Sequence, residues 1–204
     1  MYSPPRNPRH AGFSIAEITI ILTTLSVLGA AVSPSISDYV RDARRVRASS
    51  DVRVIASSLA RFLHDVGGTV TPPSNSHAVD VLVGAGETPT LGNHIDAEWA
   101  LPIDGDGVAL LDDYLVTNSI GYPRGSGRWL AAKGWSGPYV ESGVGPDPWG
   151  NRYAVNVRTL SGALGSSTVV LCAGPNGVIE TAFNHGGLAI GSDDIVGLLG
   201  SGGR

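Results

Sequence analysis

Cysteine is almost absent from this chain of 204 residues, because Cys172 is the only one. A single cysteine cannot form an intrachain disulfide, so a disulfide framework is excluded whatever compartment the protein occupies. Basic residues are also scarce after the first third: from residue 66 onward, 13 acidic residues face 6 basic ones, a formal net charge of −7. Binding to a phosphate backbone requires clustered cations and is therefore not expected of this region, whereas binding a hard divalent cation is compatible with it.

Recognisable catalytic motifs are absent as well. The five histidines, the one cysteine and the serines form no nucleophile, metal-hydrolase or phosphate-loop pattern. Asn184-His185 supplies one histidine, which does not make a transition-metal site. Asp104-Gly105-Asp106-Gly107 lacks the D-x-D-x-D-G order of an EF-hand loop, so we interpret it as a polar turn. We therefore expect a protein that is not an enzyme, with a membrane-anchored enzyme or ligand-binding domain as the competing class.

An apolar run with a single charge lies near the N-terminus. Residues 13–33 contain Glu17 as their only charged residue, and a helix of that length would span a hydrocarbon core of roughly 30 Å. Arg6 and Arg9 precede it and favour a cytoplasmic leader. A secretory signal peptide cleaved near Gly29-Ala30-Ala31 is the alternative, but an acidic residue near the start of its apolar region argues against it. A carboxylate in hydrocarbon requires a partner or a function.

The apolar residues after Pro34 recur mostly at three- and four-residue steps, which predicts an amphipathic helix with one apolar face. They are Ile36, Tyr39, Val40, Ala43, Val52, Ile55, Leu59, Phe62 and Leu63. Gly67-Gly68 and then Pro72-Pro73 end the pattern. We therefore expect one helix over residues 14–65, kinked or loosened at Pro34, whose second half packs on a globular domain.

Two strands are predicted in the last third of the chain. The segment 153–157 alternates as a half-buried strand does, and 168–172 follows it after a loop over 162–167, so we expect antiparallel neighbours. Trp149 is expected at the edge of the core. Residues 66–133 are rich in turn residues and predict only a short helix or strand over 109–116. The expected fold class is α+β: a long N-terminal helix, transmembrane in its first half, packed on a small antiparallel sheet domain with a loop-rich C-terminus.

The junction Gly12-Phe13-Ser14-Ile15-Ala16-Glu17 resembles the class III signal of type IV pilins and type II secretion pseudopilins. In that family a membrane-embedded prepilin peptidase cuts after the glycine and methylates the new N-terminal phenylalanine. The resemblance therefore implies cleavage between Gly12 and Phe13 and N-methylation of Phe13. Ile15 and Ala16 depart mildly from the family's usual residues, and Pro34 lies where such chains commonly carry a proline.

The same resemblance implies a role for Glu17 in assembly. In the family's fibres the corresponding glutamate is thought to meet the N-terminal amine of a neighbouring subunit, which neutralises two poorly solvated charges. The helix dipole also favours a negative charge this close to a helix start. Replacing Glu17 is therefore expected to impair assembly more than folding.

The C-terminal third resembles the major pseudopilin of type II secretion systems, through Asp147-Pro148-Trp149-Gly150-Asn151-Arg152-Tyr153, the two strands and a glycine-rich loop. That family's loop holds a calcium ion. Gly174-Pro175-Asn176-Gly177 stands where the family has Gly-Ala-Asp-Gly, and Asp193-Asp194-Ile195 where it has a late acidic pair. The expected calcium ligands are Asn176, Glu180, Asp193 and Asp194, with ordinary loop and capping roles as the alternative.

These features predict a structural subunit of a type II secretion pseudopilus. Its ranges are a prepilin leader (1–12), a transmembrane or fibre-core half-helix (13–33), an amphipathic half-helix (34–65) and a globular pilin-like domain (66–204). Expected partners are further copies or other pseudopilins, prepilin peptidase and an inner-membrane assembly platform. The expected location is the inner membrane, with the globular domain in the periplasm and later in a periplasmic or surface filament.

Three alternatives stay open: a type IV pilus subunit, a minor pseudopilin and a membrane-anchored periplasmic binding domain. Type IVa pilins usually close their C-terminal loop with a disulfide, which the lone Cys172 forbids, so the pseudopilin is favoured.

Overall fold

The computed structural model describes residues 12–68, 70, 79–93, 95, 97–103, 107–124, 134–161, 168–183 and 190–199, without the side chains of residues 31–35, 159 and 161. The chain divides into two compact units, Met1–Asp42 and Ala43–Arg204. The element order is α1 (Ile15–Val66), β1 (Val81–Val83), β2 (Thr90–Leu91), η1 (Ala97–Ala100), β3 (Val108–Leu110), η2 (Asp113–Thr117), β4 (Ala154–Asn156), η3 (Arg158–Ser161), β5 (Val169–Cys172), β6 (Val178–Ile179) and β7 (Ile195–Leu198).

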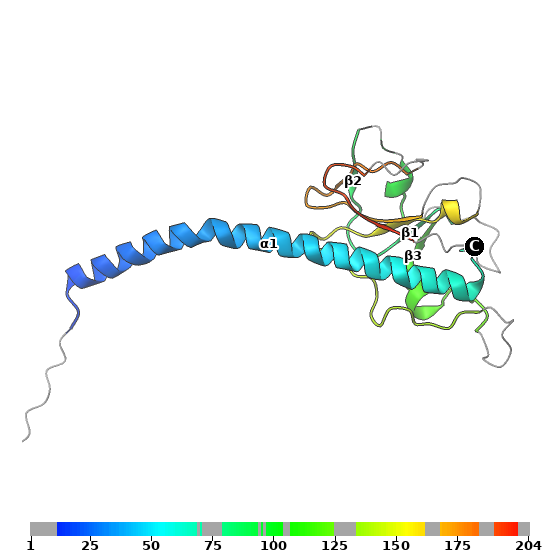
Figure 1. Cartoon of the computed structure of the whole chain (residues 1–204), viewed down its shortest axis with the longest axis horizontal. Coiled ribbons are helices and arrows are strands. Elements are labelled where there is room, and N and C mark those ends of the chain that lie inside the picture. Colours follow the sequence, from blue (N-terminus) through cyan, green and yellow to red (C-terminus); the bar gives the residue numbers. More distant parts are fainter. Residues whose placement is uncertain are drawn as a thin grey trace, which may run out of the picture. The chain divides into compact units, whose positions relative to one another are not determined.

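The predicted long helix is confirmed as α1, which has 52 residues and continues past Pro34 without a break (Figure 1). The helix ends at Val66, one residue after the predicted end at residue 65. Gly67 adopts φ 100°, a conformation that favours glycine, and the amides of Gly67 and Gly68 donate to the Leu63 carbonyl at 3.1 and 2.7 Å. The kink expected at Pro34 falls among residues 31–35, whose side chains lie outside the described part, and stays a prediction.

Among the residues that the structure describes, no helix is long and apolar enough to cross a membrane. The membrane span expected over residues 13–33 therefore has no support from the structure. Its last three residues are among those whose side chains are not described.

The main sheet has five strands in the order β3-β1-β4-β5-β7, and it is mixed. The antiparallel pairing of β4 with β5 was predicted and is confirmed. The expectation of an antiparallel sheet was wrong, because β3 pairs parallel to β1, with Val81 opposite Val108. A second, two-stranded sheet pairs β2 parallel to β6. Ala109 to Val116 proves to hold both the end of β3 and most of η2.

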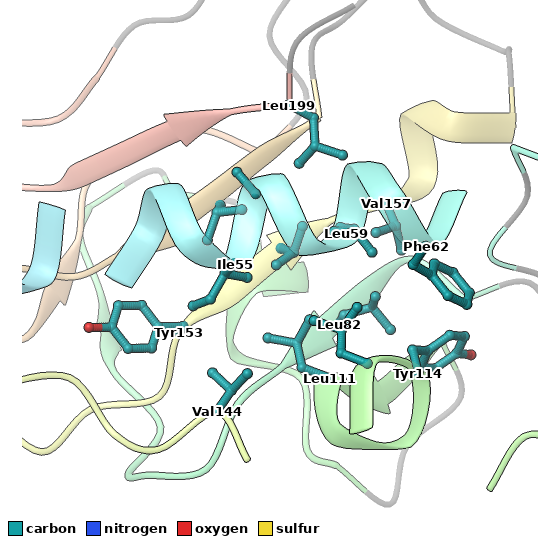
Figure 2. Close-up of a cluster of buried hydrophobic side chains, with 14 of the residues drawn as sticks. Ile55, Leu59, Phe62, Leu82, Leu111, Tyr114, Val144, Tyr153, Val157 and Leu199 are labelled. Carbon is teal, nitrogen blue, oxygen red and sulfur yellow. The ribbon is translucent and has the colours of Figure 1, made fainter. Parts of the chain in front are cut away.

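Both faces of the central strands are covered. In Figure 2, Ile55 and Leu59 of α1 point toward Leu82 of β1 and Leu111. Residues on the opposite face of the same strands pack with Trp99 and Phe183, whose rings meet edge to face at 4.8 Å. The part of α1 from Ala48 to Leu63 therefore lies on one face of the sheet, and the segments around Trp99 and Phe183 cover the other.

The end of α1 is held by an aromatic cluster. The Phe62 ring lies edge to face with the rings of Tyr114, Tyr122 and Tyr139, at centroid distances of 5.3 to 5.8 Å. Trp149 is partly buried against the same core, as predicted. Such ring pairs contribute about 0.5–1.5 kcal/mol each beyond their area burial, so the helix end is firmly attached to the sheet domain.

The prediction of one apolar face along residues 34–65 was wrong. Val52, Ile55, Leu59, Phe62 and Leu63 are buried, whereas Ile36, Tyr39, Val40 and Ala43 are exposed. Ala43 and Val52 are nine residues apart, and at about 100° per residue this is two and a half turns, so they lie on opposite sides of the helix. The exposed and the buried residues each follow steps of three and four, but the two sets are offset by half a turn. The regular steps alone therefore suggested a single face.

Candidate functional site

The Gly12–Phe13 junction lies just outside α1. Gly12, Phe13 and Ser14 precede the first helical residue, Ile15, and the Phe13 side chain is 77% exposed. A side chain built on Gly12 would meet no atom within 4 Å. The peptide bond expected to be cut is thus non-helical and open to a protease. Residues 1–11 of the expected leader lie outside the described part.

Glu17 has a partner within its own chain. Its Oε2 accepts a hydrogen bond from the Ser14 amide at 2.8 Å, and the Glu17 amide donates to Ser14 Oγ at 3.2 Å. This reciprocal pair is a capping box, which satisfies two amides at the helix start. The S-x-x-E spacing of Ser14 and Glu17 is the usual sequence signature of such a box, although no cap was predicted here. Glu17 therefore fixes where α1 begins, whatever else it does.

The first half of α1 exposes an almost continuous apolar surface. Its large apolar side chains and that of Phe13 just before it are between 44% and 87% exposed: Phe13, Ile15, Ile18, Ile20, Ile21, Leu22, Leu25, Val27 and Leu28. The hydroxyls among them do not interrupt it, since each donates to a helix carbonyl three or four residues back: Thr19, Thr23, Thr24 and Ser26. An apolar surface of this extent marks a site of association with protein or lipid.

The segment from Asp147 to Tyr153 stabilises the fold through hydrogen bonds within its own turn, to Cys172 and to α1. Asp147 is 4% exposed, and its Oδ1 accepts from the amides of Trp149 and Asn151 at 2.8 and 2.9 Å. Its Oδ2 accepts from the Cys172 thiol at 3.2 Å, and burial raises the pKa of that thiol, which keeps it a protonated donor. The Tyr153 hydroxyl donates to Asp51 of α1 at 3.0 Å. The motif therefore folds its own turn and ties the sheet to the helix.

The four expected calcium ligands come together in two adjoining loops. The Asn176 amide donates to Asp193 Oδ2 at 3.2 Å, while Asn176 Oδ1 accepts from the Val178 amide at 2.7 Å. The Glu180 amide donates to Asp194 Oδ2 at 2.9 Å. These bonds hold the turn at Asn176 and the strand β6 against the Asp193-Asp194 pair.

Asp194 is the centre of this arrangement. Its Oδ2 also accepts from the amide and the hydroxyl of Thr181, at 2.7 and 2.6 Å, and its side chain is buried. Three other carboxylate oxygens there are buried and have no hydrogen-bond partner among the residues that the structure describes: Glu180 Oε2, Asp193 Oδ1 and Asp194 Oδ1. A buried carboxylate oxygen without a donor is costly, and a cation would compensate for it.

The donor set suits calcium in kind, since carboxylate and amide oxygens are its usual ligands. The arrangement is not a finished cage, however. Within the described ranges, no three His, Cys, Asp or Glu side chains gather closely enough to hold a metal ion. Asn184-His185 and residues 104–106 lie outside these ranges.

A Ser-Asp-His group also occurs, at the end of α1. Ser136 Oγ and the Tyr139 hydroxyl donate to Asp65 Oδ2, the latter at 2.9 Å, and His64 Nδ1 lies 3.3 Å from Asp65 Oδ1. The Ser136 hydroxyl bonds the carboxylate and not the imidazole, so His64 is not placed to act as its base. The group is a tie between α1 and the segment 134–139. The hydrogen bond from Ser136 is the main cause that lowers the pKa of Asp65.

No family model, curated protein or solved structure matches this chain.

Proposed function

We propose that this protein is a structural subunit of a filament, of the type II secretion pseudopilus kind, and not an enzyme. The observation that carries the proposal is the exposed apolar half of α1, which begins two residues after a non-helical Gly12–Phe13 junction and contains one acid. A separate folded unit, Ala43–Arg204, completes the chain. A subunit that assembles through its N-terminal helices, within a membrane and then within a fibre, needs these parts.

Glu17 has two successive roles in this proposal. In the single chain it closes the capping box with Ser14. After cleavage between Gly12 and Phe13, the freed amine of Phe13 in a neighbouring copy offers a charged partner, which a carboxylate among apolar helices binds more strongly than a neutral amide. The pairing would fix the stagger between adjacent helices.

The pseudopilus is favoured over a type IV pilus by the C-terminal loops. Cys172 is the only cysteine and is buried against Asp147, so a disulfide cannot close them. In this proposal Ca²⁺ binds at Glu180, Asp193 and Asp194, with Asn176 beside them, and draws together side chains that do not form a metal site as they stand, so that the oxygens without a partner among the described residues gain one. The ion would supply electrostatic cross-linking of two loops, a structural role.

The mature N-terminus tests this proposal. Intact-mass and peptide spectrometry of the protein recovered from membranes should show residues 1–12 removed and one methyl group added to Phe13. The same sample without prepilin peptidase, and a Gly12→Val variant, should retain Met1. A wild-type chain that still begins at Met1 beside an active peptidase would identify a plain anchor, and one that begins at Val32 would identify a secretory signal. Either result contradicts the proposal.

A further inference from the structure

Asn176-Gly177 is the only asparagine-glycine pair in the chain. It lies in the turn before β6, where the Asn176 side chain is exposed and Gly177 adopts φ 67°. An asparagine followed by glycine is chemically labile, because glycine has no side chain to hinder attack of its main-chain nitrogen on the asparagine side-chain amide. The turn therefore holds a reactive pair of groups beside the acidic residues of the C-terminal loops.

Two features of the Asn176 side chain favour such an attack. Its Oδ1 accepts a hydrogen bond from the Val178 amide at 2.7 Å. A donor is thus already in place at the oxygen on which negative charge develops when a nucleophile adds to Cγ. Within the described ranges Nδ2 has no hydrogen-bond partner, so the nitrogen that must leave is open to water.

The attacking nitrogen is weakly held. Among the described residues the Gly177 amide donates only to the Gly174 carbonyl, at 3.3 Å. This distance exceeds the usual range of about 2.7–3.2 Å for such a bond. The Gly177 amide can therefore leave its acceptor at little cost.

Two other asparagines of the described chain are protected. Asn118 Nδ2 donates to the Tyr122 carbonyl at 2.9 Å, and its Oδ1 accepts from the Tyr122 amide at 3.0 Å. Asn156 is buried, and its Nδ2 donates to the Phe183 carbonyl at 2.7 Å. In both cases the leaving nitrogen is bonded and the next residue carries a side chain, so the fold restrains these asparagines and leaves Asn176 free to react.

We propose that Asn176 is a site of spontaneous deamidation, which places a further carboxylate in the C-terminal loops. The Gly177 nitrogen forms a bond to Asn176 Cγ, its proton passes through water to Nδ2, and ammonia leaves. Water then adds to Cγ of the cyclic imide and breaks the new C–N bond, which gives aspartate at position 176. Addition of water at the main-chain carbonyl gives isoaspartate instead. The two steps together consume one water and release one ammonia.

The new carboxylate changes the charge of the loops. The Asn176 amide donates to Asp193 Oδ2 at 3.2 Å, so residue 176 is in direct contact with an existing carboxylate. Like charges this close repel each other, and a bound cation offsets the repulsion. Deamidation should therefore weaken the loops without a cation and raise their affinity for Ca²⁺. This consequence rests on the calcium binding proposed above, whereas the modification itself does not.

Peptide mass spectrometry of the full-length protein in detergent tests the modification. During incubation of the folded protein at mildly alkaline pH, residue 176 should gain one mass unit while Asn118 and Asn156 stay intact. In urea the two protected asparagines should also begin to react, because the fold no longer restrains them. Asn176→Gln, whose longer side chain cyclises far more slowly, is the control. An Asn176 that stays as intact as Asn118 in the folded protein would overturn the proposal.

Calcium titration of Asn176→Asp measures the consequence. This variant should bind calcium about tenfold more tightly than wild type whose Asn176 is still intact by mass, because it adds a charged ligand. Its Tm in chelator should be lower. Arg61→Gln, which lowers the net charge by the same amount on an exposed position of α1, is the matched control and should keep the wild-type affinity.

The possible failures are distinguishable. Equal calcium affinities of Asn176→Asp and wild type would overturn the predicted effect of the new carboxylate. Absence of calcium binding in both would refute the calcium site proposed above. The mass of residue 176 supports or refutes the deamidation in either case, since it is measured without calcium.

Discussion

At the scale of single residues, the carboxylates of the C-terminal loops carry the most information. Asp194 accepts three hydrogen bonds through one oxygen, while its other oxygen is buried and has no donor in the described part of the chain. Glu180 and Asp193 each have one such oxygen. A folded protein seldom leaves buried acceptors unpaired without a reason. A bound cation is a reason that all three oxygens share.

We therefore expect calcium to stabilise the folded unit. At free calcium about a hundredfold above its dissociation constant, mass action adds about 2.7 kcal/mol, which raises Tm by several degrees. Chelation should remove this increase in a thermal-unfolding experiment, and Glu180→Gln should reduce it. Asp42→Asn, which changes an exposed carboxylate on α1, is the control and should keep it. A Tm that calcium and chelator leave unchanged in the wild type would contradict the metal site.

At the scale of elements, the end of α1 depends on Asp65. A carboxylate at a helix C-terminus is unfavourable toward the helix dipole, and the donors Ser136 and Tyr139 compensate for it. Because these bonds lower the pKa of Asp65 in the folded state, the stability they confer is present above the unfolded pKa of about 3.9 and is lost as the pH falls through the folded value.

Asp65→Asn should accordingly lower the free energy of unfolding by about 1 kcal/mol at pH 7, the size of a charge-assisted hydrogen bond that becomes neutral. The difference from wild type should shrink as the pH falls through the lowered pKa of Asp65 in the folded state. Denaturant unfolding across this range measures both. Asp38→Asn, whose pair with Arg41 is exposed, should show no difference at either pH. A difference for Asp65→Asn that does not vary with pH would contradict this account.

The elements also show what sequence reasoning could reach. α1 was placed within one residue at each end, because Gly67-Gly68 is an unambiguous stop and the apolar run an unambiguous start. β4 and β5 were found as a local antiparallel pair. β1 was not predicted, because Val81, Leu82 and Val83 are all apolar and all buried. Leu82 faces the helix and the two valines face the opposite side of the sheet, so no alternation of polar and apolar residues marks the strand. Its parallel pairing with β3 depends on contacts between distant segments, which no local pattern encodes.

The candidate sites divide in the same way. The Gly12–Phe13 junction and the four calcium-loop residues were named from local motifs, and the structure places the latter in contact through Asp193 and Asp194. A groove between α1 and β7 could not be predicted from the sequence, because Arg53 and Leu198, which both line it, are 145 positions apart in the chain. The capping box was within reach and was overlooked, since Glu17 already had an explanation.

At the scale of the whole molecule, the proposed filament requires Glu17 to do more than cap its own helix. The exposed apolar half of α1 offers attraction to any apolar partner and no selectivity. One acid at a fixed position along the helix, paired with the amine of a neighbouring copy, would select a single axial offset between adjacent helices. The capping box gives a way to separate the two roles, because Ser14→Ala and Glu17→Ala each remove one of its two hydrogen bonds, and only Ser14→Ala keeps the carboxylate.

The most direct test is therefore to count filaments by electron microscopy for wild type, Glu17→Ala and Ser14→Ala, expressed with prepilin peptidase at equal levels. We expect filaments from the wild type and from Ser14→Ala, and few or none from Glu17→Ala, with the Tm of the folded unit unchanged in all three. Equal loss in both variants would show that Glu17 serves only as a cap, and normal filaments from Glu17→Ala would contradict its role in assembly altogether.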